Sequence, residues 1–103
     1  MTDLLRTMVD RIVAGWSPLQ IILFGSHARG DAGPHSDIDL LVVLPAIADK
    51  RGVTVAIRRA LADLPVSKDI VVSTPEEIAR RGSLVGTVLR PALREGRLVY
   101  ERG

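Results

Sequence analysis

The sequence predicts a small α/β domain in which helices flank a mixed β-sheet. Two observations support this: segments with apolar residues at helical spacing alternate with short, mostly aliphatic runs typical of buried strands. The helical segments lie at 4–13 and 56–64, and the aliphatic runs at 19–24, 37–44 and 67–73. The 103 residues contain no internal repeat and are expected to form one domain spanning 1–103.

The N-terminal element is expected to be an amphipathic helix, because apolar residues recur at helical spacing over 4–13. Thr2 or Asp3 is available as its N-cap, and Gly15 is expected to end it. The run 19–24 that follows is rich in Ile and Leu, which suits a strand buried on both faces.

The middle of the chain is expected to contain a short helix, a strand and a longer helix. The short helix begins at 26–29 and leads through a loop to a strand over 37–44, which Pro45 stops. Apolar residues at helical spacing over 56–64 mark the second amphipathic helix, which ends before Pro65.

The third strand, 67–73, leads into the most specific helix start in the sequence. Thr74 can cap it, Pro75 suits the first helical position, and Glu77 completes a capping box. The chain closes with a short edge strand expected over 97–101.

Composition excludes several classes of function. Net charge is only +2, and the basic pairs Arg58-Arg59 and Arg80-Arg81 have no interleaved aromatic residues, so they indicate solvated helix faces and no nucleic-acid surface. Without cysteine there is no disulfide, thiolate metal site or cysteine nucleophile. No apolar run approaches the roughly 20 residues that span a bilayer, and no signal peptide is evident, so a cytoplasmic location away from membranes is expected.

A strand-to-helix turn and a pair of acids are the features that indicate chemistry. Gly25 and Ser26 follow a buried strand, where free backbone N–H groups attract phosphate. In an extended strand Asp37 and Asp39 project to one side, close enough to share a divalent cation. Asp69, from a neighbouring strand, is the candidate for a third carboxylate, which two-metal chemistry generally requires.

A purely structural interpretation of these acids competes with the functional one. Asp37 would then cap a turn and Asp39 would be solvated at the mouth of a strand. Against this, Asp39 lies within an apolar run, where an unpaired carboxylate is costly and a metal would relieve the cost. Asp69 is in the same situation, although Lys68 could instead pair with a local acid.

Gly-Ser-x-Ala-Arg-Gly at 25–30, Ser-Asp-x-Asp-Leu at 36–40 and one Asp on a later strand together resemble the DNA polymerase β nucleotidyltransferase superfamily. Within it the chain most resembles the minimal nucleotidyltransferases, over 21–100. The resemblance implies their fold and the transfer of AMP from ATP to a hydroxyl, with Mg²⁺, two ions in all, and departure of pyrophosphate.

Two groups of residues take their roles from this resemblance. The metal-binding and catalytic group is Asp37, Asp39 and Asp69. The nucleotide-binding group is Gly25, Ser26, Arg29 and Ser36. Asp69 would also help to activate the attacking hydroxyl. Arg29 either reaches a phosphate or pairs with an acid on the same face. A role as a turn residue is favoured for Ser36 over a role as a nucleophile.

The acceptor follows only from the same resemblance. Family members that are encoded beside HEPN-domain toxins act as antitoxins by adding AMP to the toxin. The resemblance therefore implies a protein adenylyltransferase that forms a hetero-oligomer with a helical HEPN-type partner. Two alternatives stay open: a non-catalytic module that occludes such a partner, and a small-molecule nucleotidyltransferase with its acceptor domain on another chain. The apolar segment 84–93 is either a partner surface or a cover for the sheet.

Overall fold

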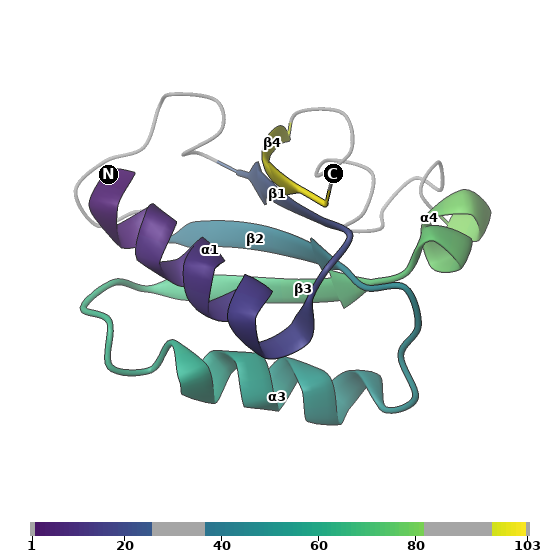
Figure 1. Ribbon diagram of the computed structural model, residues 1–103, viewed down its shortest axis with the longest axis horizontal. Helices are drawn as coiled ribbons and strands as arrows, with labels where there is room; N and C mark the ends of the chain where they lie inside the picture. Colours follow the sequence, from purple (N-terminus) through teal and green to yellow (C-terminus); the bar gives the residue numbers. More distant parts are fainter. Residues whose placement is uncertain (1, 26–36, 82–95, 103) are drawn as a thin grey trace.

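A four-stranded sheet with two helices packed on one face forms the framework of the protein (Figure 1). The computed structural model describes residues 2–25, 37–81 and 96–102. Along the chain its elements are α1 (Thr2–Trp16), β1 (Gln20–Phe24), β2 (Ile38–Val43), α3 (Lys50–Ala60), β3 (Lys68–Ser73), α4 (Pro75–Arg81) and β4 (Arg97–Glu101).

The sheet is mixed, as predicted, with the strand order β3-β2-β1-β4. β1 runs antiparallel to both β2 and β4, whereas β2 and β3 are parallel. A parallel pair needs a long crossover connection, and α3 supplies it. The two central strands, β1 and β2, flank residues 26–36 in the chain.

The core lies between the sheet and the two long helices. Its buried members are all aliphatic: Met8, Val9, Ile12, Ile21, Leu23, Ile38, Leu40, Val42, Leu44, Ile57, Leu61, Ile70 and Val72. Trp16 and Tyr100 pack against this cluster. A smaller cluster around Leu41 and Val43 covers part of the opposite face of the sheet, so β2 is buried on both faces.

The first helix confirms the periodicity and corrects both predicted ends. It begins at Thr2, so Asp3 lies in its first turn and neither residue is the N-cap. The helix continues one residue beyond Gly15. Ser17 adopts the left-handed conformation, with φ of 46°, and its N–H donates to the carbonyl of Val13 at 3.1 Å. The C-terminal cap that we assigned to Gly15 is thus made by Ser17.

The second long helix begins well before the predicted segment 56–64. α3 begins at Lys50, where the side chain of Asp49 caps it by accepting from the N–H of Gly52 at 3.1 Å. It ends at Ala60 and is followed by a turn. The prediction missed its start because the first three residues, Lys50, Arg51 and Gly52, are exposed and carry no apolar side chain.

The start of α4 is confirmed at Thr74 and Pro75, whereas the carboxylate of Glu77 accepts from Oγ of Ser73 at 2.7 Å. Pro75 is its first residue, and the hydroxyl of Thr74 accepts from the N–H of Glu77 at 3.1 Å. β4 is confirmed as an edge strand. The helix expected at 26–29 and the apolar segment 84–93 lie outside the described residues. None of the described helices combines the length and apolarity that crossing a bilayer requires.

Candidate active site

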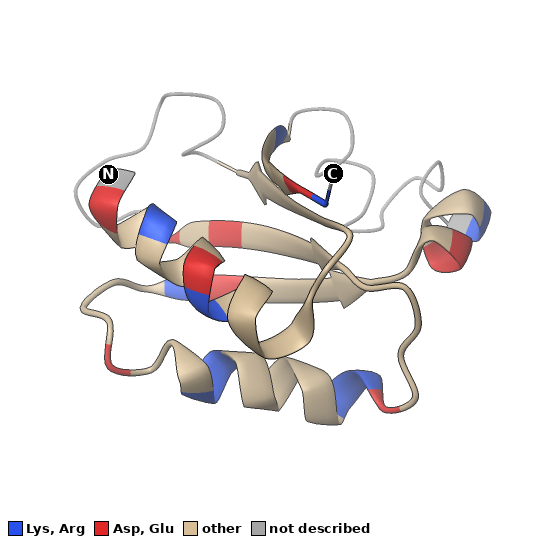
Figure 2. Ribbon diagram, in the orientation of Figure 1, with Lys and Arg blue, Asp and Glu red and all other residues tan. Residues whose placement is uncertain are grey.

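Two of the three predicted acids lie side by side on the parallel strands. Asp39 of β2 pairs in register with Asp69 of β3. Alternation along the strands places both on the face of the smaller cluster, away from α1 and α3, because their neighbours Ile38, Leu40, Ile70 point into the main core. Figure 2 shows the acidic positions of β2 and β3 as neighbouring red bands. Two like charges in adjacent register favour a cation between or beside them.

Gly25, the residue after β1, lies next to Asp39, and we call Gly25, Asp39 and Asp69 together the acidic corner of the sheet. Gly25 follows Phe24, which pairs with Asp39, and it has a φ of 74°. A Cβ at this position would lie only 2.2 Å from Oδ2 of Asp39, so no side chain fits while that carboxylate keeps its place. The glycine was predicted because phosphate needs close approach to the backbone; the structure adds that it also leaves room for the Asp39 carboxylate.

The first acid of the pair, Asp37, lies just outside the strand. β2 begins at Ile38, whose N–H donates to the carbonyl of Ser67 at 2.9 Å, so the strand is one residue shorter at this end than predicted. Asp37 is exposed and Asp39 is half-buried. Among the residues that the structure describes, no three acidic or histidine side chains come together as a metal-sized group.

The orientation of Asp69 is set by an arginine that the sequence did not single out for this site. Nη2 of Arg58 donates to Oδ1 of Asp69 at 2.7 Å, and both side chains are about half exposed. Arg58 belongs to α3, which packs on the opposite face, so it reaches Asp69 at the outer strand of the sheet. Lys68 donates instead to the carbonyl of Leu64 at 3.3 Å. In the sequence, only the positive charge of Arg58 indicated that it could pair with an acid.

The residues present fit a divalent cation such as Mg²⁺. Carboxylate oxygens are the ligands this ion prefers, and it commonly uses one or two carboxylates together with phosphate oxygens of a substrate. The carboxylate of Asp39 lies against Gly25, in space that a Cβ at this position would fill. Three predicted nucleotide-binding residues lie outside the described residues: Ser26, Arg29 and Ser36. Both histidines, His27 and His35, lie there too.

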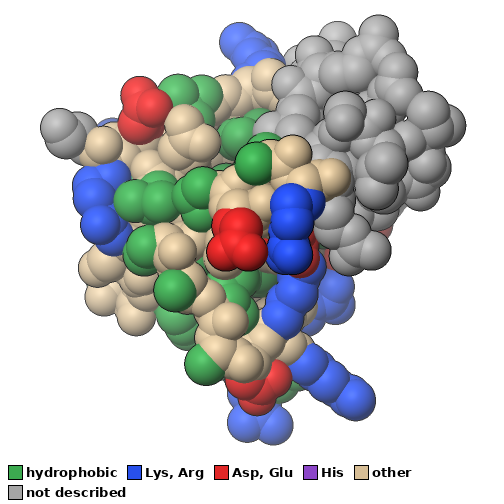
Figure 3. All heavy atoms as spheres, turned by 90° about the vertical axis from the view of Figure 1, so that its right-hand side faces the viewer, with side chains coloured by type: hydrophobic (Ala, Val, Ile, Leu, Met, Phe, Trp, Pro, Cys, Tyr) green, Lys and Arg blue, Asp and Glu red, His purple; other side chains and the backbone are tan. Residues whose placement is uncertain are grey.

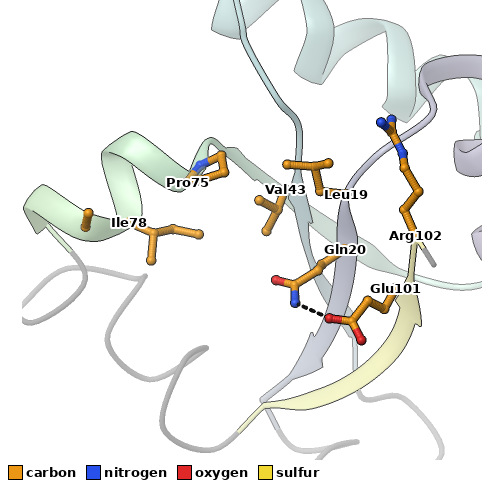
Figure 4. Close-up of a pocket in the computed structure, with 8 residues that line it drawn as sticks. Leu19, Gln20, Val43, Pro75, Ile78, Glu101 and Arg102 are labelled. Carbon is orange, nitrogen blue, oxygen red and sulfur yellow. Dashed lines mark hydrogen bonds between the residues drawn. The ribbon is translucent and has the colours of Figure 1, made fainter.

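A pocket of about 430 Å³ lies at the other end of the sheet (Figure 4). Leu19, Val43 and Ile78 supply its apolar wall, and Nε2 of Gln20 donates to Oε2 of Glu101 at 3.0 Å beside them. Gln20 pairs with Val43, four residues along β1 from the pairing with Asp39, which corresponds to about 13 Å. This pocket is therefore separate from the acidic corner.

The surface next to α4 carries balanced charge. Nζ of Lys50 contacts Oε1 of Glu77 at 2.7 Å, and Nη2 of Arg80 lies 3.7 Å from Oε1 of Glu76. Figure 3 shows acidic and basic side chains next to one another on this side of the molecule. Because each of these two cations has an acidic partner, the arrangement gives no preference for an anionic ligand here.

Comparison with known proteins places the chain in a family. The model of the nucleotidyltransferase domain matches residues 5–91, and the chain belongs to that family. Among curated proteins it is similar to a bifunctional uridylyltransferase/uridylyl-removing enzyme of Bordetella pertussis, with 44% identity over 59 residues. That match covers 54% of this chain and 7% of the relative, so the chain corresponds to a small part of that enzyme.

Solved structures show the same fold. A protein of Sulfolobus solfataricus described as a nucleotidyltransferase superposes with a TM-score of 0.68 at 22% identity, covering 96% of this chain and 78% of that one. A mutant of the toxin–antitoxin complex MntA–HpeT gives 0.67 at 23%, covering 94% and 72%. A toxin–antitoxin structure with AMP-PNP gives 0.63 at 21%, covering 94% and 73%. The predicted fold of a minimal nucleotidyltransferase is thereby confirmed.

Proposed function

We propose that this chain transfers AMP from ATP to a hydroxyl of a partner protein, as an antitoxin that adenylylates a HEPN-type toxin. The observation that carries the proposal is the packing of Gly25 against Asp39, with Asp69 in register beside it, in a chain of the nucleotidyltransferase family. Structural neighbours described as toxin–antitoxin complexes, one of them with AMP-PNP, support the choice of partner and nucleotide.

The three acids take distinct roles in this proposal. Asp37 and Asp39 would hold Mg²⁺, with Asp69 as the third carboxylate. Two bound Mg²⁺ ions would supply charge neutralisation at the phosphate oxygens. Asp69 accepts the proton of the attacking hydroxyl, whose oxygen forms a bond to the α-phosphorus of ATP. The bond from the α-phosphorus to the oxygen that bridges the α- and β-phosphates breaks, and pyrophosphate leaves with the electron pair.

Gly25 supports the nucleotide side of the site. Its missing side chain leaves room for the Asp39 carboxylate at the end of β1, and its positive φ is a conformation that residues with a Cβ rarely adopt. We assign Ser26, Arg29 and Ser36 to the same nucleotide.

The test is coexpression of the chain with a helical HEPN-type protein, followed by intact mass measurement of that partner. The wild-type chain should increase the partner's mass by whole AMP units, and Asp39→Asn should leave it unmodified. Asp10→Asn is the matched control, because it removes the same charge from an exposed position of α1. Full modification by Asp39→Asn, or none by the wild type, would contradict the proposal. Protection of cells without modification would favour a module that only occludes its partner.

A different nucleobase in the donor has one specific observation in its favour. The curated relative with 44% identity over 59 residues is described as a uridylyltransferase, which makes UTP the second candidate donor. Incubating the chain and its partner with ATP or UTP labelled at the α-phosphate distinguishes the two. We expect label from ATP alone; label from UTP alone would keep the reaction type and change the base.

A further inference from the structure

The ion pair between Arg58 and Asp69 joins two parts of the fold that otherwise face in opposite directions. Asp69 shares its sheet face with Val71, which packs in the smaller cluster away from α3. Arg58 follows Ile57, the residue of α3 that is fully buried in the main core. The contact closes around the outer edge of β3, the terminal strand of the sheet.

This pair competes with any cation that needs the same carboxylate. Oδ1 of Asp69 already accepts from Arg58 at 2.7 Å, and within the described residues the acids do not gather as a metal-sized group. Asp69 would otherwise stand as a second negative charge in register with Asp39. The guanidinium therefore neutralises Asp69, as a bound divalent cation would.

The exposure of the pair makes it easy to exchange. The two side chains are 51% and 53% exposed, and ion pairs in such surroundings contribute little to stability because water screens them and both side chains lose freedom. A divalent cation held by other carboxylates can displace such a partner.

We propose that Arg58 is a positioning residue for the third acid: it holds Asp69 toward α3 and yields it when the divalent cation binds. The inference rests on the proposed function, since it takes Asp69 as a metal ligand. Loss of Arg58 removes a competitor for Asp69, so the cation should bind more tightly, by about two- to fivefold given the weak coupling of exposed ion pairs.

The experiment is calorimetric titration of the full chain with the Mn²⁺ complex of a non-hydrolysable ATP analogue. Arg58→Gln should bind the complex about two- to fivefold more tightly than the wild type. Arg59→Gln is the matched control: it removes the same charge from the next, exposed position of α3 and has no ion pair to a described residue. Arg58→Lys, which keeps the charge and a donor, should bind as the wild type does.

A double-mutant cycle with Asp69→Asn separates a positioning role from a general effect of charge. The gain from Arg58→Gln should vanish when Asp69 is already neutral, because no competition for its carboxylate remains. The inference is overturned if Arg58→Gln changes affinity no more than Arg59→Gln, or if its gain persists in the Asp69→Asn background. If the wild-type chain does not bind the complex and Asp39→Asn does not differ from it, the proposed function itself fails, and the inference falls with it.

Discussion

Replacing Gly25 with alanine should damage the candidate site far more than it damages the fold. The substitution adds one methyl group at a residue whose φ is 74°, and that methyl would lie 2.2 Å from Oδ2 and 3.2 Å from Cγ of Asp39. The two effects are separable, because one is a property of the backbone and the other is a contact with a movable side chain.

The stability cost comes mainly from the backbone. A non-glycine residue in the left-handed region costs about 1 to 2 kcal/mol, which lowers Tm by roughly 4 to 16 °C for a domain of this size. The contact itself is relieved when the Asp39 carboxylate rotates, since Oδ2 is a terminal atom of a short side chain. That rotation displaces a proposed metal ligand by more than 1 Å, and misplacement of this order reduces activity by about 100-fold.

The assay measures Tm and transfer of labelled nucleotide for Gly25→Ala and Gly25→Asn. Asparagine tolerates the left-handed region better than alanine but carries the same Cβ. We therefore expect Gly25→Asn to recover part of the lost Tm and none of the lost activity. Wild-type activity in Gly25→Ala, or recovery of activity in Gly25→Asn, would refute the assignment of Gly25 as the residue that leaves room for the Asp39 carboxylate.

Three further predictions concern the framework that supports the site. Asp49→Ala removes the cap of α3 and should cost about 1 kcal/mol in urea denaturation, while Asp49→Asn keeps an acceptor and should cost little. The hydrogen bond from Arg11 lowers the pKa of Asp63, so their pair stabilises the folded state at neutral pH. The stability lost in Asp63→Asn at about pH 7 should therefore disappear as the pH falls below about 4. Glu77→Ala leaves the buried hydroxyl of Ser73 without its acceptor and should cost about 1 to 3 kcal/mol, with a smaller loss for Glu77→Gln, whose amide oxygen can still accept.

Local signals in the sequence were sufficient where the physical cause is local. The cap of α4 depends on Thr74, with Pro75 as the first helical residue, and the two are neighbours in the chain; the predicted start is the observed one. Strand positions were predicted to within a residue or two because an apolar run between turn residues has few other uses in a chain of this length. The boundaries that failed lacked such a signal. α1 passes Gly15 because the cap geometry formed at Ser17, and the start of α3 is polar.

The chain by itself determined the chemistry of the candidate site: the glycine turn after the first strand, the acids one residue apart, and the single acid on a later strand. Alternation along a strand predicts which side chains share a face; this applies to Asp39 and Asp69, whereas Asp37 lies just outside β2. Only the tertiary structure decided how these parts meet. The register that sets Asp39 beside Asp69 depends on a parallel crossover, and the ion pair from Arg58 depends on α3 packing along an edge strand. Both join residues that are distant in sequence, and such contacts follow from packing of the whole sheet, which no local pattern encodes.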